Sequence, residues 1–96
     1  MDSIFYTYIL QSQIKLTHYY GHTENLVQRL KRHNAGNVRS TKSGIPWKVI
    51  YFEQFSTKSE AYKRELFFKS INGYKFLKEN KIKIGRAHVW TPVTSL

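Results

Sequence analysis

Two consecutive β-rich runs at the start of the chain limit most strongly what it can fold into. Within residues 4–10 the side chains alternate, so that Tyr8 and its alternate neighbours face one side and Thr7 and its neighbours the other. Residues 11–13 are polar, and residues 14–21 form a second β-rich run that ends in glycine. A short polar connection between two such runs predicts an antiparallel hairpin.

A helix is predicted to follow the hairpin directly. Thr23 is a suitable N-cap residue, and the apolar residues after it recur at helical spacing until residues 34–36, where the helix is expected to stop. Arg29 and His33 are four residues apart within this helix. They are therefore expected on the same helical face.

The middle of the chain changes composition. Residues 35–46 are rich in Gly, Asn, Ser, Thr, Arg and Lys without periodicity, which is typical of an exposed basic loop or a poorly formed helix. Residues 47–55 are β-branched and aromatic, and this composition predicts a third strand.

A second helix is predicted over residues 58–72. Thr57 and Glu60 have the spacing of a capping box, and Gly73 is expected to end the helix. Glu65 falls beside the apolar side of this helix, which predicts a half-buried carboxylate. With a further helical turn or two after Gly73, the element order β-β-α-(α)-β-α predicts an α+β fold, a small three-stranded antiparallel sheet flanked by helices.

Composition limits the function classes. The 96 residues include 41% hydrophobic residues, enough for one small packed domain, and no cysteine, which excludes disulfides and thiolate metal sites. The first ten residues have neither the basic region nor the sustained apolar region of a signal peptide, and no apolar run approaches the ~18 residues of a membrane span, so a cytoplasmic location without membrane association is expected. Sixteen Lys and Arg against six acidic residues give a net charge of +10, and nucleic acid is the first candidate partner.

An ordered set of polar residues resembles the GIY-YIG nuclease superfamily, and most closely its small stand-alone bacterial members of the UPF0213 type. The set consists of Tyr8, the run Tyr19-Tyr20-Gly21, Arg29, His33 and Glu65. The sequence departs from the namesake letters, because Tyr6-Thr7-Tyr8 stands for Gly-Ile-Tyr and shares only the tyrosine. The family's asparagine is not assigned, since Asn72 is near the expected place without a clear equivalence.

The resemblance implies a metal-dependent endonuclease that hydrolyses phosphodiester bonds of DNA. Glu65 would hold one divalent ion, Mg²⁺ or Mn²⁺, largely through water, and Arg29 would bind the scissile phosphate. Tyr8 and Tyr19 would orient or deprotonate the attacking water, and His33 would relay its proton or bind phosphate. Without the family pattern, Glu65 would simply pair with Lys69 at i+4.

Substrate binding is expected to depend on basic residues beside an aromatic ring. The predicted nucleic-acid-binding residues are Arg29, Arg39, Lys42, Trp47, Lys48 and Lys69. The chain is too small for a separate recognition domain, so we expect selectivity for DNA structure rather than sequence, with a role in DNA repair or recombination. The alternative is a non-catalytic nucleic-acid-binding module on the same fold. RNA is left open as a substrate, and no obligate protein partner is expected.

The last residues match nothing that precedes them. Residues 84–96 closely resemble a translated sequencing-library adapter in which a TGA codon is taken as Trp90. We therefore predict a domain over residues 1–83 and a non-native tail over residues 84–96.

Overall fold

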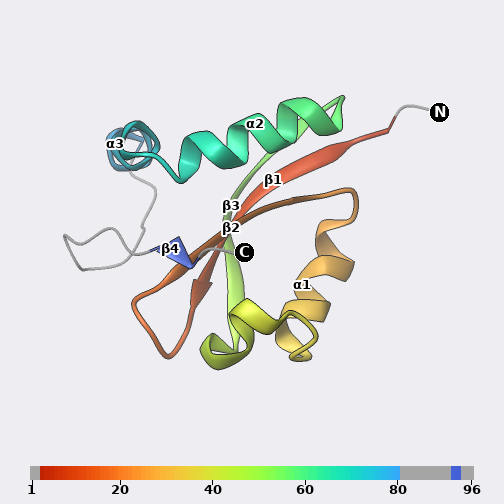
Figure 1. Ribbon diagram of the computed structural model, residues 1–96, viewed down its shortest axis with the longest axis vertical. Helices are drawn as coiled ribbons and strands as arrows, with labels where there is room; N and C mark the ends of the chain where they lie inside the picture. Colours follow the sequence, from red (N-terminus) through yellow and green to blue (C-terminus); the bar gives the residue numbers. More distant parts are fainter. Residues whose placement is uncertain (1–2, 81–91, 94–96) are drawn as a thin grey trace.

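The computed structural model describes residues 3–80 and 92–93 (Figure 1). The chain forms a sheet with helices on both sides. The elements in order are β1 (Phe5–Ser12), β2 (His18–Thr23), α1 (Leu26–Asn34), the 3₁₀ helix η1 (Arg39–Gly44), β3 (Trp47–Phe55), α2 (Lys58–Phe68), α3 (Ile71–Glu79) and β4 (Pro92–Val93). Within these ranges, no helix is long and apolar enough to cross a membrane.

The sheet confirms the predicted three antiparallel strands. The strand order is β3-β1-β2-β4, with β1 antiparallel to both β2 and β3. Strand β4 adds two residues parallel to β2. Apart from these two residues, the predicted non-native tail lies outside the described residues.

Strand alternation divides the core into two layers. Tyr8 and Leu10 pack with α1 and the start of β3 on one face, which we call the α1 face. Ile9 and Tyr20 pack with α2 and α3 on the opposite face, called the α2 face. A bulge in the β1–β3 pairing lies between Ile9 and Leu10. The central strand β1 is therefore buried on both sides, as the alternation of its apolar residues predicts.

The second strand begins later than predicted. Ile14 and Leu16 are exposed, and β2 starts only at His18. Ser12 explains the difference, because its hydroxyl accepts hydrogen bonds from the backbone N–H groups of Ile14 and Lys15 and fixes a turn there.

The first helix also begins later than predicted. Asn25, not Thr23, is the N-cap of α1, and its side chain accepts a hydrogen bond from the Gln28 N–H at 3.0 Å. The Thr23 hydroxyl instead accepts from the Asn25 N–H at 3.2 Å and shapes the turn before the helix.

The predicted helix over residues 58–72 is two helices. Helix α2 ends at Phe68, and Ser70 caps α3 by accepting a hydrogen bond from the Gly73 N–H. Gly73 lies inside α3 rather than ending a helix. A Cβ there would collide with the Phe67 carbonyl, so glycine permits the close approach of α3 to the end of α2.

Candidate active site

The tyrosines of the predicted site lie together on the α1 face. Tyr8 and Tyr19 are both buried, and their ring centroids are 6.1 Å apart. Gly21 is the cross-strand partner of Tyr8. A Cβ on Gly21 would lie 2.6 Å from the Tyr8 hydroxyl oxygen, so only glycine leaves room for the Tyr8 side chain as it stands.

Helix α1 brings His33 against Tyr8. His33 is fully buried, with Nε2 3.1 Å from the Tyr8 hydroxyl and Nδ1 2.8 Å from the Thr41 hydroxyl. Thr41 donates its own proton to the Val38 carbonyl, so it accepts from His33 Nδ1–H. The Nε2 atom is then unprotonated, and Tyr8 donates its proton to it.

This position limits what His33 can do. Both ring nitrogens are already hydrogen-bonded, to Tyr8 and Thr41, so neither is free for the predicted alternative of direct phosphate binding. Burial, with the nearby charges of Arg29 and Arg32, lowers the pKa of His33 to about 4. His33 is therefore neutral at physiological pH and serves as the hydrogen-bond acceptor of Tyr8.

Arg29 links the two tyrosines. Burial lowers the pKa of Arg29, but interactions with the hydroxyls of Tyr8 and Tyr19 outweigh this effect and raise it overall. The buried Arg29 Nε atom has no hydrogen-bond partner within the described residues. Burial, and next the proximity of Tyr19, raise the pKa of Tyr8, while Arg29 opposes the rise. In the free protein Tyr8 thus keeps its proton at neutral pH.

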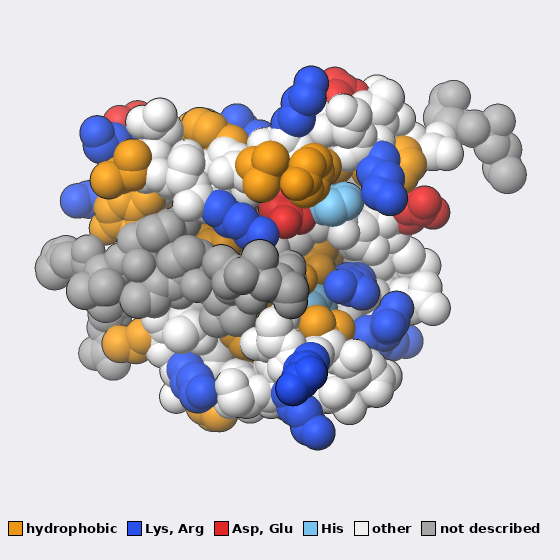
Figure 2. Space-filling view, viewed as in Figure 1, with side chains coloured by type: hydrophobic (Ala, Val, Ile, Leu, Met, Phe, Trp, Pro, Cys, Tyr) orange, Lys and Arg blue, Asp and Glu red, His pale blue; other side chains and the backbone are white. Residues whose placement is uncertain are grey.

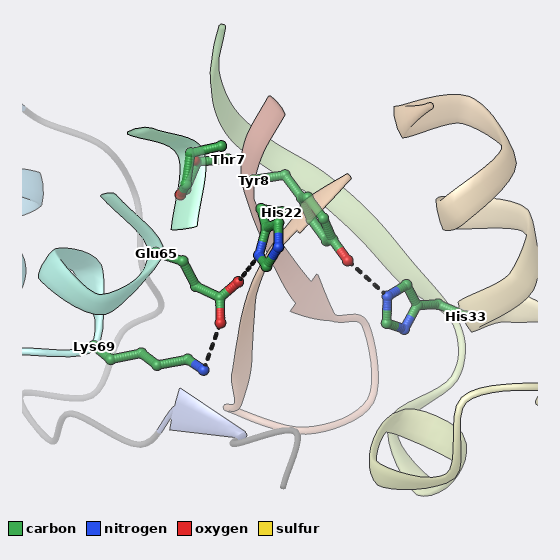
Figure 3. Close-up of polar contacts among 7 residues, drawn as sticks. Thr7, Tyr8, His22, His33, Glu65 and Lys69 are labelled. Carbon is green, nitrogen blue, oxygen red and sulfur yellow. Dashed lines mark hydrogen bonds and ion pairs between the residues drawn. The ribbon is translucent and has the colours of Figure 1, made fainter. Parts of the chain in front are cut away.

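Glu65 belongs to a second polar cluster (Figure 3). Helix α2 is joined to β1 by the Thr7 hydroxyl, which donates to the Ala61 carbonyl at 2.7 Å, one turn before Glu65. Glu65 is only 6% exposed, more buried than predicted. One oxygen lies 2.7 Å from His22 Nδ1 and the other 2.8 Å from Lys69 Nζ. The Lys69 pairing follows the i+4 spacing.

His22 is a site residue that the sequence reasoning missed. It follows Gly21 in β2, so alternation places it on the α2 face, opposite to Tyr8 and Tyr19. That alternation was an available signal, but its partner Glu65 is 43 residues further along the chain. No local pattern links the two.

A pocket joins the two clusters at the end of β2. Its volume is about 340 Å³, and it is lined by Phe5, His22, Thr23, Glu24, Arg29 and Lys58. Arg29 reaches it from α1 and His22 from β2, while Lys58 belongs to the first turn of α2. The pocket is therefore the place where a ligand can contact residues of both clusters.

The residues around Glu65 fit the expected metal ion only if water supplies most of its ligands. Within residues 3–80, no group of three or more His, Asp or Glu side chains is placed to hold a metal. Glu65 supplies one carboxylate, whose oxygens keep further lone pairs beyond the bonds to His22 and Lys69. A hydrated Mg²⁺ or Mn²⁺ held through one carboxylate fits these residues. The Lys69 ammonium competes with such an ion for its oxygen.

The predicted nucleic-acid-binding residues separate into two groups. Arg39, Lys42 and Lys48 are exposed. Trp47, by contrast, is 3% exposed and donates its indole N–H to the Thr41 carbonyl at 2.7 Å. The burial of this ring in the core contradicts the prediction of Trp47 as a nucleic-acid-binding residue.

The family-model match and the relatives found by sequence agree on one family. The profile of the GIY-YIG catalytic domain matches residues 4–82. A UPF0213 protein of Pediococcus pentosaceus is 39% identical over 84 residues, which cover 83% of this chain and 87% of that protein. A UPF0213 protein of Listeria monocytogenes is 44% identical over 57 residues, or 58% of this chain and 64% of that protein. The solution NMR structure of a UPF0213 protein from Bacillus halodurans is 27% identical, with a TM-score of 0.49 over 82% of this chain and 86% of that one.

Proposed function

The chain belongs to the GIY-YIG family, a nuclease superfamily, and on this premise we propose that it is an endonuclease that hydrolyses DNA phosphodiester bonds with a divalent ion. The family implies a nucleic-acid substrate and typically a divalent metal. The observation that carries the proposal is the pocket lined by both Arg29 and His22, the hydrogen-bond partner of Glu65.

Arg29 is the proposed phosphate-binding residue. Its guanidinium carries a fixed positive charge and a planar set of donors, of which the buried Nε–H has no partner within the described residues. A phosphate oxygen in the pocket would satisfy such a donor and neutralise the charge. Negative charge developing on the phosphate during hydrolysis would strengthen the same interaction.

Tyr8 is the proposed residue for the attacking water. Its proton points to His33 Nε2 and its oxygen interacts with Arg29, which leaves one lone pair of that oxygen to orient a water molecule. If Tyr8 accepts a proton from that water, its own proton moves to His33. The raised pKa of Tyr8 and the lowered pKa of His33 oppose this transfer in the free protein, so the transfer depends on the bound substrate. Tyr19 also contacts Arg29 and is the alternative for orienting the water.

Glu65 is the proposed holder of the metal, Mg²⁺ or Mn²⁺. When bound, the ion would supply positive charge to the phosphate and the leaving oxygen. His22 fixes one carboxylate oxygen, and Lys69 must share or release the other. We further propose that substrate choice depends on DNA structure rather than sequence, in repair or recombination.

The test is a cleavage assay on plasmid, forked and single-stranded DNA with Mg²⁺ or Mn²⁺. Glu65→Ala and Arg29→Ala should each lower cleavage at least about 100-fold, the size expected for loss of one strong transition-state contact. Glu79→Ala and Lys31→Ala are the controls, because both side chains are exposed on helices and neither lines the pocket. Cleavage that is absent, or equal in wild type and Glu65→Ala, would refute the proposal.

One observation favours a second function, nucleic-acid binding without cleavage. The Lys69 ammonium already neutralises Glu65, as a structural ion pair would. Salt-sensitive DNA binding without metal-dependent cleavage in the same assay would identify this case.

A further inference from the structure

One side of α2 carries a row of three exposed residues and one half-buried lysine that the proposed mechanism does not use as a unit. The row consists of Lys58, Tyr62, Leu66 and Lys69, and we call it the α2 ridge. The spacings of four, four and three residues place these side chains on one helical face. Tyr62 and Leu66 are each 48% exposed, and a lysine stands at either end.

The α2 ridge borders the active site at three points. The Tyr62 ring lies edge-on to His22, with centroids 5.5 Å apart. Lys58 lines the pocket that also contains Arg29, and Lys69 pairs with Glu65. Figure 2 shows hydrophobic and basic side chains beside an acidic side chain and a histidine over α2. If a DNA strand places a phosphate on Arg29, its neighbouring nucleotides can therefore lie along the α2 ridge.

The composition of the ridge suits an unpaired strand. The exposed aromatic ring offers a stacking surface for a base, Lys58 offers a charge for a neighbouring phosphate, and Lys69 offers a second charge where it releases Glu65. Lys69 lies eleven positions after Lys58, a rise of about 16 Å along the helix, which is the length of a few nucleotides. In a duplex the faces of the bases are covered by their neighbours, so a ring mounted on a helix can stack only on an unpaired base.

We propose that the α2 ridge binds unpaired nucleotides next to the phosphate that is cut, with a base stacked on Tyr62. Tyr62 in the ridge, rather than the buried Trp47, supplies the exposed aromatic ring beside basic residues. This inference rests on the proposed nuclease function and deepens it. It makes DNA with unpaired nucleotides, such as a flap or a bubble, the preferred substrate.

The test measures binding of the full chain in EDTA, so that cleavage does not interfere. Single-stranded DNA containing 2-aminopurine reports stacking by fluorescence quenching, and a blunt duplex of the same sequence is the comparison. Tyr62→Ala should weaken single-strand binding between about fivefold and about 150-fold, the range for loss of one base–aromatic stack, and should abolish the quenching. Tyr62→Phe keeps the ring and should bind within about twofold of wild type.

Phe52→Ala is the matched control. Phe52 is 46% exposed and lies on β3 beside Tyr6, away from α2, so its loss should leave single-strand binding unchanged. Tyr62→Ala that binds single strands like wild type, or that loses single-strand and duplex binding equally, would overturn the inference. Neither result bears on the cleavage assay, so failure of this inference is distinguishable from failure of the proposed function.

Discussion

Replacing Thr41 by valine should change the tautomer of His33. The Thr41 hydroxyl accepts from His33 Nδ1–H at 2.8 Å inside the core, and valine keeps the shape of threonine without that acceptor. The Val38 carbonyl, which also accepts from Thr41, keeps its bond from the Thr41 backbone N–H at 3.1 Å. The substitution therefore leaves one buried group, the His33 Nδ1–H, without a partner.

The expected loss of stability in Thr41→Val follows from the unpaired His33 Nδ1–H. A buried donor without a partner costs about 1–3 kcal/mol of the free energy of unfolding. His33 can reduce this cost by moving its proton to Nε2, but it then donates to Tyr8 and no longer accepts the Tyr8 proton. Thr41→Val should thus destabilise the protein by up to about 3 kcal/mol and also lower cleavage.

Two measurements check this reasoning. Nitrogen NMR of His33 should show the Nδ1–H tautomer in wild type and in Thr41→Ser, and the Nε2–H tautomer in Thr41→Val. Urea unfolding should give a larger loss of stability for valine than for serine, which keeps the acceptor and loses only a buried methyl group. A wild-type His33 already protonated on Nε2, or a valine variant as stable as wild type, would refute the assignment of the Tyr8 proton.

Three further predictions concern packing, pH and the tail. Gly21→Ala should cost about 1–3 kcal/mol in chemical unfolding, because its Cβ would lie 2.6 Å from the Tyr8 hydroxyl oxygen; an unchanged midpoint would contradict this. Burial lowers the pKa values of His18 and His33 from 6.5 to about 4, so between these pH values the unfolded chain binds more protons than the folded chain. Stability should be complete above pH 6.5 and fall as the pH decreases towards 4, and His33→Gln should flatten that fall in unfolding curves recorded across this range. Deleting residues 84–96 should leave the thermal midpoint within about 2 °C of the full chain, and a larger drop would show that the tail supports the fold.

The fold was predictable where one local pattern had no competitor. Strand β3 has the predicted bounds, Trp47–Phe55, because a β-branched and aromatic run starts after a proline and ends before a serine. The start of α1 was not predictable from capping preference alone. Thr23 and Asn25 are both good caps, and the structure uses Asn25 for the helix and Thr23 for the preceding turn.

The site divides in the same way. The four-residue spacing of Arg29 and His33 predicts a shared face, but it does not show that His33 is buried against Thr41. The prediction for Trp47 fails for a related reason. An aromatic residue after a basic loop resembles a surface residue, whereas its ring packs against Gly44, where a Cβ would collide with it. Such contacts depend on tertiary packing, which residue spacing does not reveal.

Strand β2 also determines which changes of chain length this protein can tolerate. Tyr19 and His22 are three residues apart, an odd spacing that sends one side chain to each face of the sheet. A single inserted residue between them would turn His22 toward the tyrosines and separate it from Glu65. Added residues in the exposed turn over residues 13–16 would not alter this geometry, because loops accept extra length at low cost. Within this hairpin, functional homologues should therefore vary in length in the turn and not in the four residues of β2 that begin at Tyr19.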